Sequence, residues 1–307
     1  MISLELAEEI ISRHARCTDE TEIVSLDNAL NRILAEDVFS DMDMPPFDKS
    51  AMDGYACRRE DISQPLTIIE TIAAGSEPKN TLSIGQCAKI MTGAKVPVGA
   101  NCVITIEDTS LTNDGKVLFI GKNTSDNICK RGEDIISGIH ILQMGLLINP
   151  QTMAVLASVG KTNVLVAKKL NIGVFCTGSE LIEPDKKPSG VQIRNSNASQ
   201  IVAQITSTGS VANYYGIIAD NREKISQKIN ELLKTNHIVL ITGGASVGDF
   251  DFIPEIFQQS GFTVHFQKIR IQPGKPVIYA TYNKKHIFGL SGNPVSSFLQ
   301  FELLVKP

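Results

Sequence analysis

The spacing of hydrophobic residues changes along the chain, and each change marks a different kind of structure. Residues 3–16 carry apolar side chains at helical spacing, which predicts an amphipathic helix with Ser3 as its N-cap. Residues 27–35 predict a second, shorter helix. Regular structure then ends at Pro45-Pro46, because proline cannot continue a helix. We interpret this proline pair as a domain boundary.

Short apolar runs separated by glycines follow the proline pair. Runs of this kind are typical of strands in a small barrel or sandwich. We therefore predict a small, barrel-like β-rich domain over residues 46–139. The predicted strands are 66–69, 87–91 and 102–106.

The next stretch returns to a mixed pattern that is similar to the opening segment. It predicts a helix over 150–159 and a short strand over 163–166. We therefore expect residues 1–45 and 140–167 to form one discontinuous linking and dimerisation domain.

Strand and helix patterns alternate over residues 168–307, which predicts a mostly parallel, three-layer α/β domain. The fold class predicted for the whole chain is α/β plus β, in an elongated multi-domain arrangement. The last predicted helix begins after Asn293-Pro294, a cap followed by proline in the first turn. The other predicted elements are strands 172–176, 211–218, 238–241, 264–271, 277–281 and 286–290, and helices 198–207, 222–233 and 253–259.

Three glycine-rich turns adjoin apolar strands in this predicted α/β domain. They are 242–248, 272–276 and 289–294. Glycine permits positive φ and a close approach of the backbone to a bound group. Open α/β sheets bind ligands, often anionic ones, at the carboxyl ends of their strands. The turns therefore predict one shared cleft for an oxyanion, with ordinary strand-to-helix turns as the alternative.

Composition narrows the class of protein. The net charge of −4 argues against nucleic acid as the main partner. The N-terminal segment lacks the apolar core of a signal peptide, and no apolar run approaches the ~20 residues of a membrane span. The six cysteines are scattered without CxxC pairs, which favours free thiols in a reducing compartment. We expect a cytoplasmic protein with no membrane or nucleic-acid partner.

Polar residues cluster at several turns, and the types present favour one chemistry. The sequence contains no Walker lysine motif, no GxGxxG and no set of nucleophile, histidine and acid. Carboxylates and lysines around glycine turns suit a phosphate or other oxyanion held with a divalent metal. Capped turns and solvated charges are the alternative for each cluster taken alone. The clusters are 48–55, 91–94, 130–134, 176–181 and the group Lys268, Arg270 and Lys275.

The combination of these motifs, in this order, resembles the molybdopterin molybdenumtransferases, the MoeA family, which is related to the E domain of gephyrin. The most specific motif is PPFDKSAMDGYA at 45–56, and the likeness extends over essentially the whole chain. The other matching motifs are 90–94, 131–134, 177–181, 243–248, 273–276 and 289–296.

The resemblance implies a molybdenum insertase. Such an enzyme inserts molybdate into adenylylated molybdopterin with the help of Mg²⁺ and releases AMP, which forms the molybdenum cofactor. It also implies an elongated homodimer with its active cleft between subunits, and a molybdopterin adenylyltransferase as a possible partner.

The resemblance also assigns roles to particular residues of this chain. Its catalytic residues would be Asp53, Thr92, Asp134, Glu180 and Lys275. Glu180 and Asp251 would hold Mg²⁺, which prefers carboxylate oxygen, with helix capping as their alternative role. Its substrate-binding residues would be Thr177, Gly178, Asp220, Gly243, Gly244, Ser246, Gly248, Gly274, Gly292, Asn293 and Pro294.

Four positions depart from the family pattern. Family members usually have an acid at Ser179, a lysine at Gln272, a proline at Ser291 and an asparagine at Lys49. They also usually continue into a C-terminal β-domain that is absent here, so we expect a trimmed chain or a reduced homologue. The alternative function is therefore a weakened or inactive homologue that binds molybdopterin or molybdate, or serves as a scaffold. An unrelated sugar- or nucleotide-phosphate enzyme is the third possibility.

Overall fold

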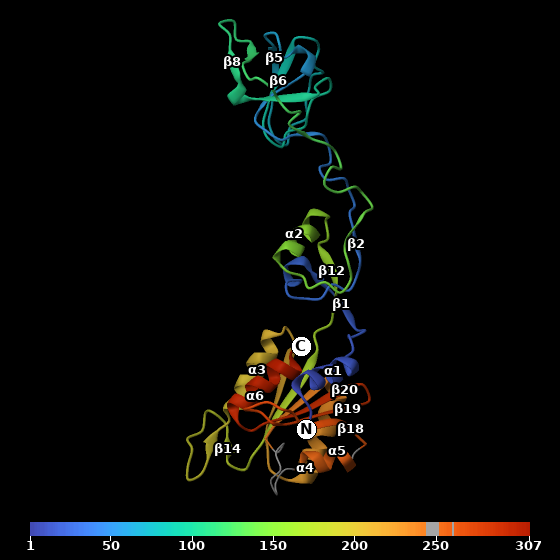
Figure 1. Cartoon of the computed structure of the whole chain (residues 1–307), viewed down its shortest axis with the longest axis vertical. Helices are drawn as coiled ribbons and strands as arrows, with labels where there is room; N and C mark the ends of the chain where they lie inside the picture. Colours follow the sequence, from blue (N-terminus) through green and yellow to red (C-terminus); the bar gives the residue numbers. More distant parts are fainter. Residues whose placement is uncertain (244–251, 260) are drawn as a thin grey trace. The chain divides into compact units, whose positions relative to one another are not determined.

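A computed structural model describes residues 1–243, 252–259 and 261–307. The chain divides into two compact units, and Figure 1 shows their elements coloured along the sequence. Residues 1–23 and 165–307 form the first unit, and residues 24–164 form the second. The content is mixed α/β with several sheets, as predicted. The predicted boundaries of three domains stay a prediction.

The first unit is built on a six-stranded sheet in the order β16-β13-β17-β20-β19-β18. The neighbours from β16 to β20 are parallel, whereas β19 and β18 add antiparallel pairs at one edge. All six strands match predicted apolar runs. Their bounds are β13 (Asn171–Thr177), β16 (Val211–Ile218), β17 (Ile238–Thr242), β18 (Thr263–Lys268), β19 (Pro276–Tyr282) and β20 (Lys285–Leu290).

Helices cover both faces of this sheet, which explains why the middle positions of its central strands are apolar or glycine on both faces. Alternate residues of a strand point to opposite faces, so Phe175 and Ile241 contact one helix layer while Val174 and Leu240 contact the other. The first layer contains α4 (Arg222–Thr235) and α5 (Ile253–Gln259). The second contains α1 (Leu4–His14), α3 (Ser196–Ser207), α6 (Pro294–Gln300) and the π-helical turn Phe301–Val305.

The predicted helix caps are present. Ser3 Oγ accepts a hydrogen bond from the Leu6 N–H of α1. Asn293 Oδ1 accepts from the N–H groups of Val295 and Ser296, with Pro294 in the first turn of α6. Both caps satisfy donors that a helix N-terminus leaves unpaired.

The second unit contains a four-stranded sheet in the order β5-β6-β4-β7. Its two edge strands, β5 and β7, do not pair with each other, so the described strands form an open sheet and not the predicted barrel. The predicted runs 66–69, 87–91 and 102–106 correspond to β5, β6 and β7. The bounds are β4 (Gly54–Cys57), β5 (Thr67–Ile72), β6 (Gln86–Ile90), β7 (Cys102–Thr105), and the hairpin β8 (Thr109–Leu111) and β9 (Val117–Phe119).

The helix predicted over 27–35 is wrong. This segment contains a single 3₁₀ turn, Leu26–Asn28. Three residues later Asn31 adopts a positive φ of 60°, which an α-helix cannot include. The next residues run extended beside residues 145–148, to which Asn31 and Leu34 donate backbone hydrogen bonds. Other pairs here are β2 (Val38–Phe39) with β11 (His140–Leu142) and β1 (Thr21–Ser25) with β12 (Asn163–Ala167), while α2 (Pro150–Ser158) matches a predicted helix.

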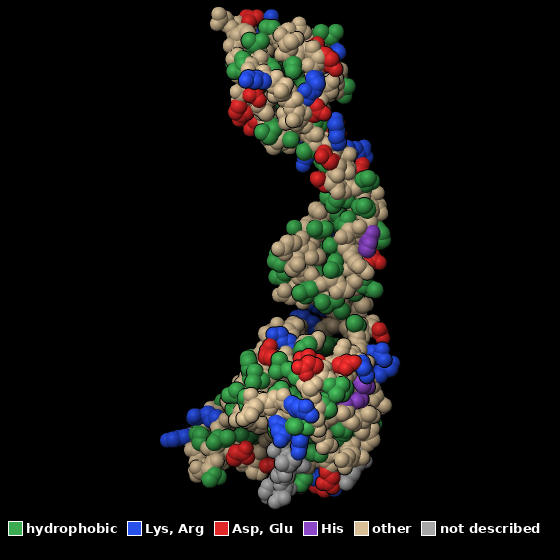
Figure 2. Space-filling model, in the orientation of Figure 1, with side chains coloured by type: hydrophobic (Ala, Val, Ile, Leu, Met, Phe, Trp, Pro, Cys, Tyr) green, Lys and Arg blue, Asp and Glu red, His purple; other side chains and the backbone are tan. Residues whose placement is uncertain are grey.

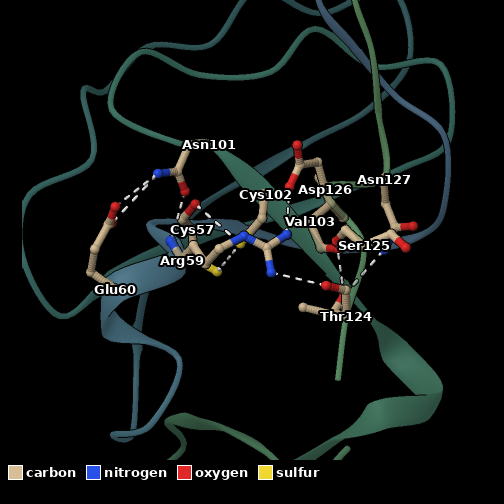
Figure 3. Close-up of polar contacts among 10 residues, drawn as sticks. All are labelled: Cys57, Arg59, Glu60, Asn101, Cys102, Val103, Thr124, Ser125, Asp126 and Asn127. Atoms are coloured by element: carbon tan, nitrogen blue, oxygen red, sulfur yellow. Dashed lines mark hydrogen bonds and ion pairs between the residues drawn. The ribbon is translucent and has the colours of Figure 1, made fainter. Parts of the chain in front are cut away.

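A polar network holds the segment that leaves the four-stranded sheet (Figure 3). The Arg59 guanidinium donates to Thr124 O at 2.9 Å and to Asp126 Oδ1 at 2.5 Å. Asn127 Nδ2 donates to Val103 O of β7 at 2.8 Å. These bonds fix residues 124–127 beside β7, from where the chain continues into β10 (Ile128–Cys129).

Stability of the first unit should fall as the pH drops below about 6.5. The ring of His14 in α1 packs on the ring of His265 in β18. Tyr279 stacks with both His265 and His286, and its hydroxyl lies 2.9 Å from His286 Nδ1. Burial, with the nearby His14 adding to it, lowers the pKa of both His265 and His286. Their folded pKa values therefore lie below the unfolded value of about 6.5. The unfolded chain then binds more protons as pH falls through that value, so acid removes stability.

The measurement is the free energy of unfolding between neutral and acidic pH. His286→Phe should make stability less dependent on pH. An equal slope for the wild type and His286→Phe would contradict the prediction.

Candidate active site

A pocket of about 320 Å³ lies at the carboxyl ends of β13, β17 and β20. These three strands are parallel neighbours, so their last residues and the following turns meet at one edge of the sheet. A volume of this size is at the lower end of those that hold small molecules. The lining comprises Thr177, Gly178, Glu180, Leu181, Ile193, Arg194, Asn195, Ser196, Asn197, Asp220, Thr242, Gly243, Pro276, Ser291, Gly292 and Pro294.

The first wall is the turn after β13, which carries two acidic side chains. Asp220 Oδ2 accepts from both the backbone N–H of Ser179, at 2.8 Å, and its hydroxyl, at 3.0 Å. The Glu180 carboxylate folds back over Gly178, where a Cβ would lie 2.8 Å from Glu180 Oε1. Ser179 therefore fixes Asp220 in the pocket wall. The short strands β14 (Leu181–Ile182) and β15 (Ile193–Arg194) extend this wall.

The second wall is the turn after β17. Gly243 has a φ of 91°, and a Cβ there would lie 2.2 Å from the backbone oxygen of Thr177. Only glycine permits both the positive φ and this close approach of two turns. The predicted residues Gly244, Ser246, Gly248 and Asp251 lie outside the described residues.

Asn197 links the second wall to the turn after β20. Its Nδ2 donates to Thr242 Oγ1 at 2.9 Å and to Gly292 O at 2.8 Å. Within the described residues, the two buried side-chain oxygens that lack a hydrogen-bond partner are Thr177 Oγ1 and Asn197 Oδ1, and both belong to residues of the pocket lining. Buried polar atoms are normally paired, so this wall retains unused capacity for a polar ligand.

Residues 193–197 line the pocket but were not among the predicted site residues. The signal was the polar run Asn195-Ser196-Asn197, in which Asn195 Oδ1 accepts from Ala198 N–H and caps α3. A capping asparagine predicts the start of a helix. In an α/β domain the helix start lies close to the carboxyl end of a strand, here β13, so the polar residues around the cap can line a pocket there.

The turn 271–276 carries Lys275 beside the pocket. Gly274 is buried, whereas the side chains of Gln272 and Lys275 are exposed. Pro276 belongs to the lining, and Gly274, Lys275 and Asn293 are on the adjoining turns. The strand predicted over 264–271 ends at Lys268, because its partner β19 begins at Pro276, opposite Lys268, and the chain then turns. Strand alternation therefore does not place Arg270 and Gln272 on one face with Lys268.

Two other predicted catalytic residues meet in the second unit. Asp53 Oδ1 accepts from the backbone N–H of Thr92 at 2.6 Å and from its hydroxyl at 2.8 Å. The Thr92 N–H, and then its hydroxyl, lower the pKa of Asp53. Asp53 is therefore a fixed carboxylate anion at neutral pH.

Asp134 is held by a different set of contacts. Its backbone N–H donates to Met44 O at 3.0 Å. The same turn is clamped by Asp48, whose Oδ1 accepts from Arg131 N–H and whose Oδ2 accepts from Lys130 Nζ, both at 2.9 Å. These contacts, the backbone N–H of Arg131 foremost, lower the pKa of Asp48. Pairing of β10 with β3 (Lys49–Ser50) brings the two segments together.

The first unit thus has the architecture of a ligand-binding α/β protein, with acidic and unpaired polar groups at the strand ends. Residues 2–160 match the family described as MoeA N-terminal region (domain I and II), and residues 173–307 match one described as probable molybdopterin binding domain.

Known proteins identify the family. The chain is 38% identical over 305 residues to a molybdopterin molybdenumtransferase of Bacillus subtilis, across 96% of this chain and 71% of that protein. One from Staphylococcus epidermidis is 38% identical over 292 residues, across 92% and 70%. A crystal structure of the molybdopterin biosynthesis MoeA protein from Pyrococcus horikoshii superimposes with a TM-score of 0.84 at 32% identity, across 100% of this chain and 78% of that one. The chain belongs to the molybdopterin molybdenumtransferase (MoeA) family.

None of the helices that the structure describes is long and apolar enough to cross a membrane.

Proposed function

We propose that this protein inserts molybdenum into molybdopterin, taking molybdate and adenylylated molybdopterin and releasing AMP. Family membership at 38% identity across 96% of the chain is the observation that carries the proposal. The pocket supports it, because glycine turns at strand ends are suited to phosphates and the lining also offers polar groups for a larger ligand. We assign molybdopterin binding to the domain 168–307.

The residues of the pocket fit a magnesium ion. Mg²⁺ is usually bound by one or two carboxylates together with substrate phosphates and water. Glu180 and Asp220 both line the pocket, although the described residues form no cluster of three metal-ligating side chains. Glu180 would hold Mg²⁺ together with Asp251, with Asp220 as a further carboxylate in the same wall. The bound ion would neutralise charge on the phosphates.

The protein's own groups then have distinct roles. Lys275 is the cation for the oxyanion, since its exposed side chain stands on a turn beside the pocket. Asp53 is a fixed anion oriented by Thr92. Asp134, on its clamped turn, is a third catalytic acid. The family resemblance supplies the roles of Asp53 and Asp134, and the hydrogen bonds of the two segments support their fixed placement.

Release of AMP from adenylylated molybdopterin, with and without molybdate, tests the function. An insertase releases AMP faster when molybdate is present. Binding of adenylylated molybdopterin without AMP release would favour the alternative, a binding or scaffold homologue, which Gln272 in place of lysine also favours. A protein that neither binds adenylylated molybdopterin nor releases AMP would contradict both the insertase and the binding or scaffold function.

We also propose a homodimer formed through the linking segments, in the cytoplasm, with a molybdopterin adenylyltransferase as a further partner. Residues 33–39 and 139–147 lie side by side and expose large apolar side chains. Figure 2 shows apolar side chains on the surface near the strand labelled β2 in Figure 1. Exposed apolar patches commonly mark protein interfaces. The exposed side chains are Ile33, Phe39, Ile139, Met144, Leu146 and Leu147.

Leu147→Asp should convert the dimer to a monomer of 33.3 kDa. Leu147 is 53% exposed, so a carboxylate there remains solvated in the monomer but would be buried in the interface. Ile84→Asp is the control, because Ile84 is an exposed apolar residue on a turn outside the linking segments. Light scattering at micromolar concentration measures the mass. A monomeric wild type would contradict the proposal.

A further inference from the structure

Gln300, the last residue of α6, is fully buried and makes three hydrogen bonds to two turns of the active site. Its Nε2 donates to Gly274 O and to Pro276 O, both at 2.7 Å. Its Oε1 accepts from the backbone N–H of Ser291 at 2.8 Å. Both amide hydrogens and one oxygen lone pair are therefore used within the protein.

The orientation of this amide is fixed by its partners. The backbone oxygens of Gly274 and Pro276 can only accept, and the Ser291 N–H can only donate. A flipped amide would place Oε1 against two carbonyl oxygens and Nε2 against an N–H, which would lose all three bonds.

The two carbonyl groups that receive these bonds belong to the residues on either side of Lys275. Gln300 therefore holds the backbone on both sides of this lysine. Gly274 permits the contact, because its φ is 110° and a Cβ there would lie 3.4 Å from Gln300 Nε2 and 3.0 Å from Ile271 Cδ1.

The third bond connects this turn to the wall of the pocket. Ser291 lines the pocket, and its backbone oxygen accepts from Thr242 Oγ1 at 3.2 Å. One amide thus links the Lys275 turn to the turn after β20, which is in turn linked to the end of β17.

Filling the core does not require such an amide. Burying an amide is unfavourable unless its polar atoms are paired, and an apolar side chain of similar size would pack there without that cost. Gln204 of α3 offers a comparison, since it is also buried but its amide bonds within the helix layer. Its Nε2 donates to Phe298 O and Glu302 Oε1, and its Oε1 accepts from Gln200 Nε2.

We propose that Gln300 is a positioning residue that fixes Lys275 relative to the pocket, so that the ammonium group meets the oxyanion in one geometry. This inference rests on the proposed function, in which Lys275 binds molybdate. Without Gln300 the Lys275 turn gains conformational freedom. Binding of the oxyanion must then order this turn, which lowers the affinity.

The test compares Gln300→Met with Gln204→Met, which removes a buried amide of the same type elsewhere in the helix layer. Methionine is similar in length and keeps the packing. Gln300→Met should raise the KM for molybdate about tenfold and change kcat little, consistent with the loss of one or two hydrogen bonds. Gln204→Met should leave the KM for molybdate unchanged. Equal effects of the two variants on the KM for molybdate would show that the role of Gln300 is merely structural.

Hydrogen exchange of residues 269–277, followed by mass spectrometry in the full chain, gives an answer that does not depend on activity. Gln300→Met should accelerate exchange there, and Gln204→Met should not. Unchanged exchange would overturn the inference whatever the activity, and faster exchange with an unchanged KM would overturn the link to molybdate. A wild type without molybdate-dependent AMP release would instead contradict the proposed function, while the exchange data would still decide whether Gln300 holds the turn.

Discussion

Lys275→Ala is expected to lower molybdate-dependent release of AMP between about tenfold and a hundredfold. A hydrogen bond to a charged group in a partly dry site contributes roughly 1.5–3 kcal/mol, which corresponds to this loss. Lys275 is exposed on the turn beside the pocket, where its ammonium group can meet an anion. Steady-state release of AMP at varied molybdate concentration measures the effect.

Two further variants make this result specific. Lys224→Ala removes the same charge from an exposed site on α4 and should leave activity unchanged. Gln272→Lys restores a second cation on the turn and should strengthen molybdate-dependent release by up to about tenfold. If Gln272→Lys has no effect while Lys275→Ala remains fully active, this turn is structural and the oxyanion binds elsewhere.

Gly243→Ala is expected to abolish binding of adenylylated molybdopterin and to destabilise the first unit by about 3 kcal/mol or more. A Cβ at Gly243 would lie 2.2 Å from Thr177 O, and the φ of 91° is unfavourable for alanine. The Cβ is bonded directly to the backbone after β17, and Thr177 O is a backbone atom at the end of β13, so relief requires these two turns to move apart. That movement distorts the pocket wall, so binding and stability should fall together.

The control for this variant is Gly216→Ala on β16 of the same sheet. Gly216 has a similar φ of 82°, but a Cβ there would meet no described atom within 4 Å. Its substitution should cost only the backbone strain, about 1 kcal/mol, and leave binding intact. Chemical denaturation and equilibrium binding measure the two effects. Equal losses for both variants would show that the close approach to Thr177 is unimportant.

The sequence predicted the sheet of the first unit because its signals are local. A strand such as β17, buried on both faces, carries a continuous apolar run over residues 238–241, and Asn293-Pro294 is a cap followed by proline in the first turn of a helix. The same reasoning placed the turns after β17 and β20 in one cleft, whereas the turn after β13 was predicted only as a cluster of polar residues. The structure brings Thr177, Gly178, Glu180, Asp220, Gly243, Gly292 and Pro294 of the predicted site residues into one pocket.

The failures concern interactions between distant segments. Residues 27–35 have a helical pattern, but pairing of residues 31–34 with 146–148 overrides it. The apolar pattern of 264–271 continues past Lys268, yet β18 ends there because its partner β19 begins at Pro276. Gln300 gave no signal at all, because a single glutamine in a helix has no pattern that would reveal two turns bonded to its amide.

The bond from Ser291 to Gln300 has an evolutionary consequence. Proline has no N–H, so proline at position 291 would leave Gln300 Oε1 buried without a donor, which costs about 1–3 kcal/mol. Replacing Gln300 first would release the Lys275 turn. Each substitution alone is therefore unfavourable, whereas the two substitutions together need not be. The two positions should therefore change as a pair along a lineage. A homologue with proline at 291 is therefore expected to carry a residue other than glutamine at 300.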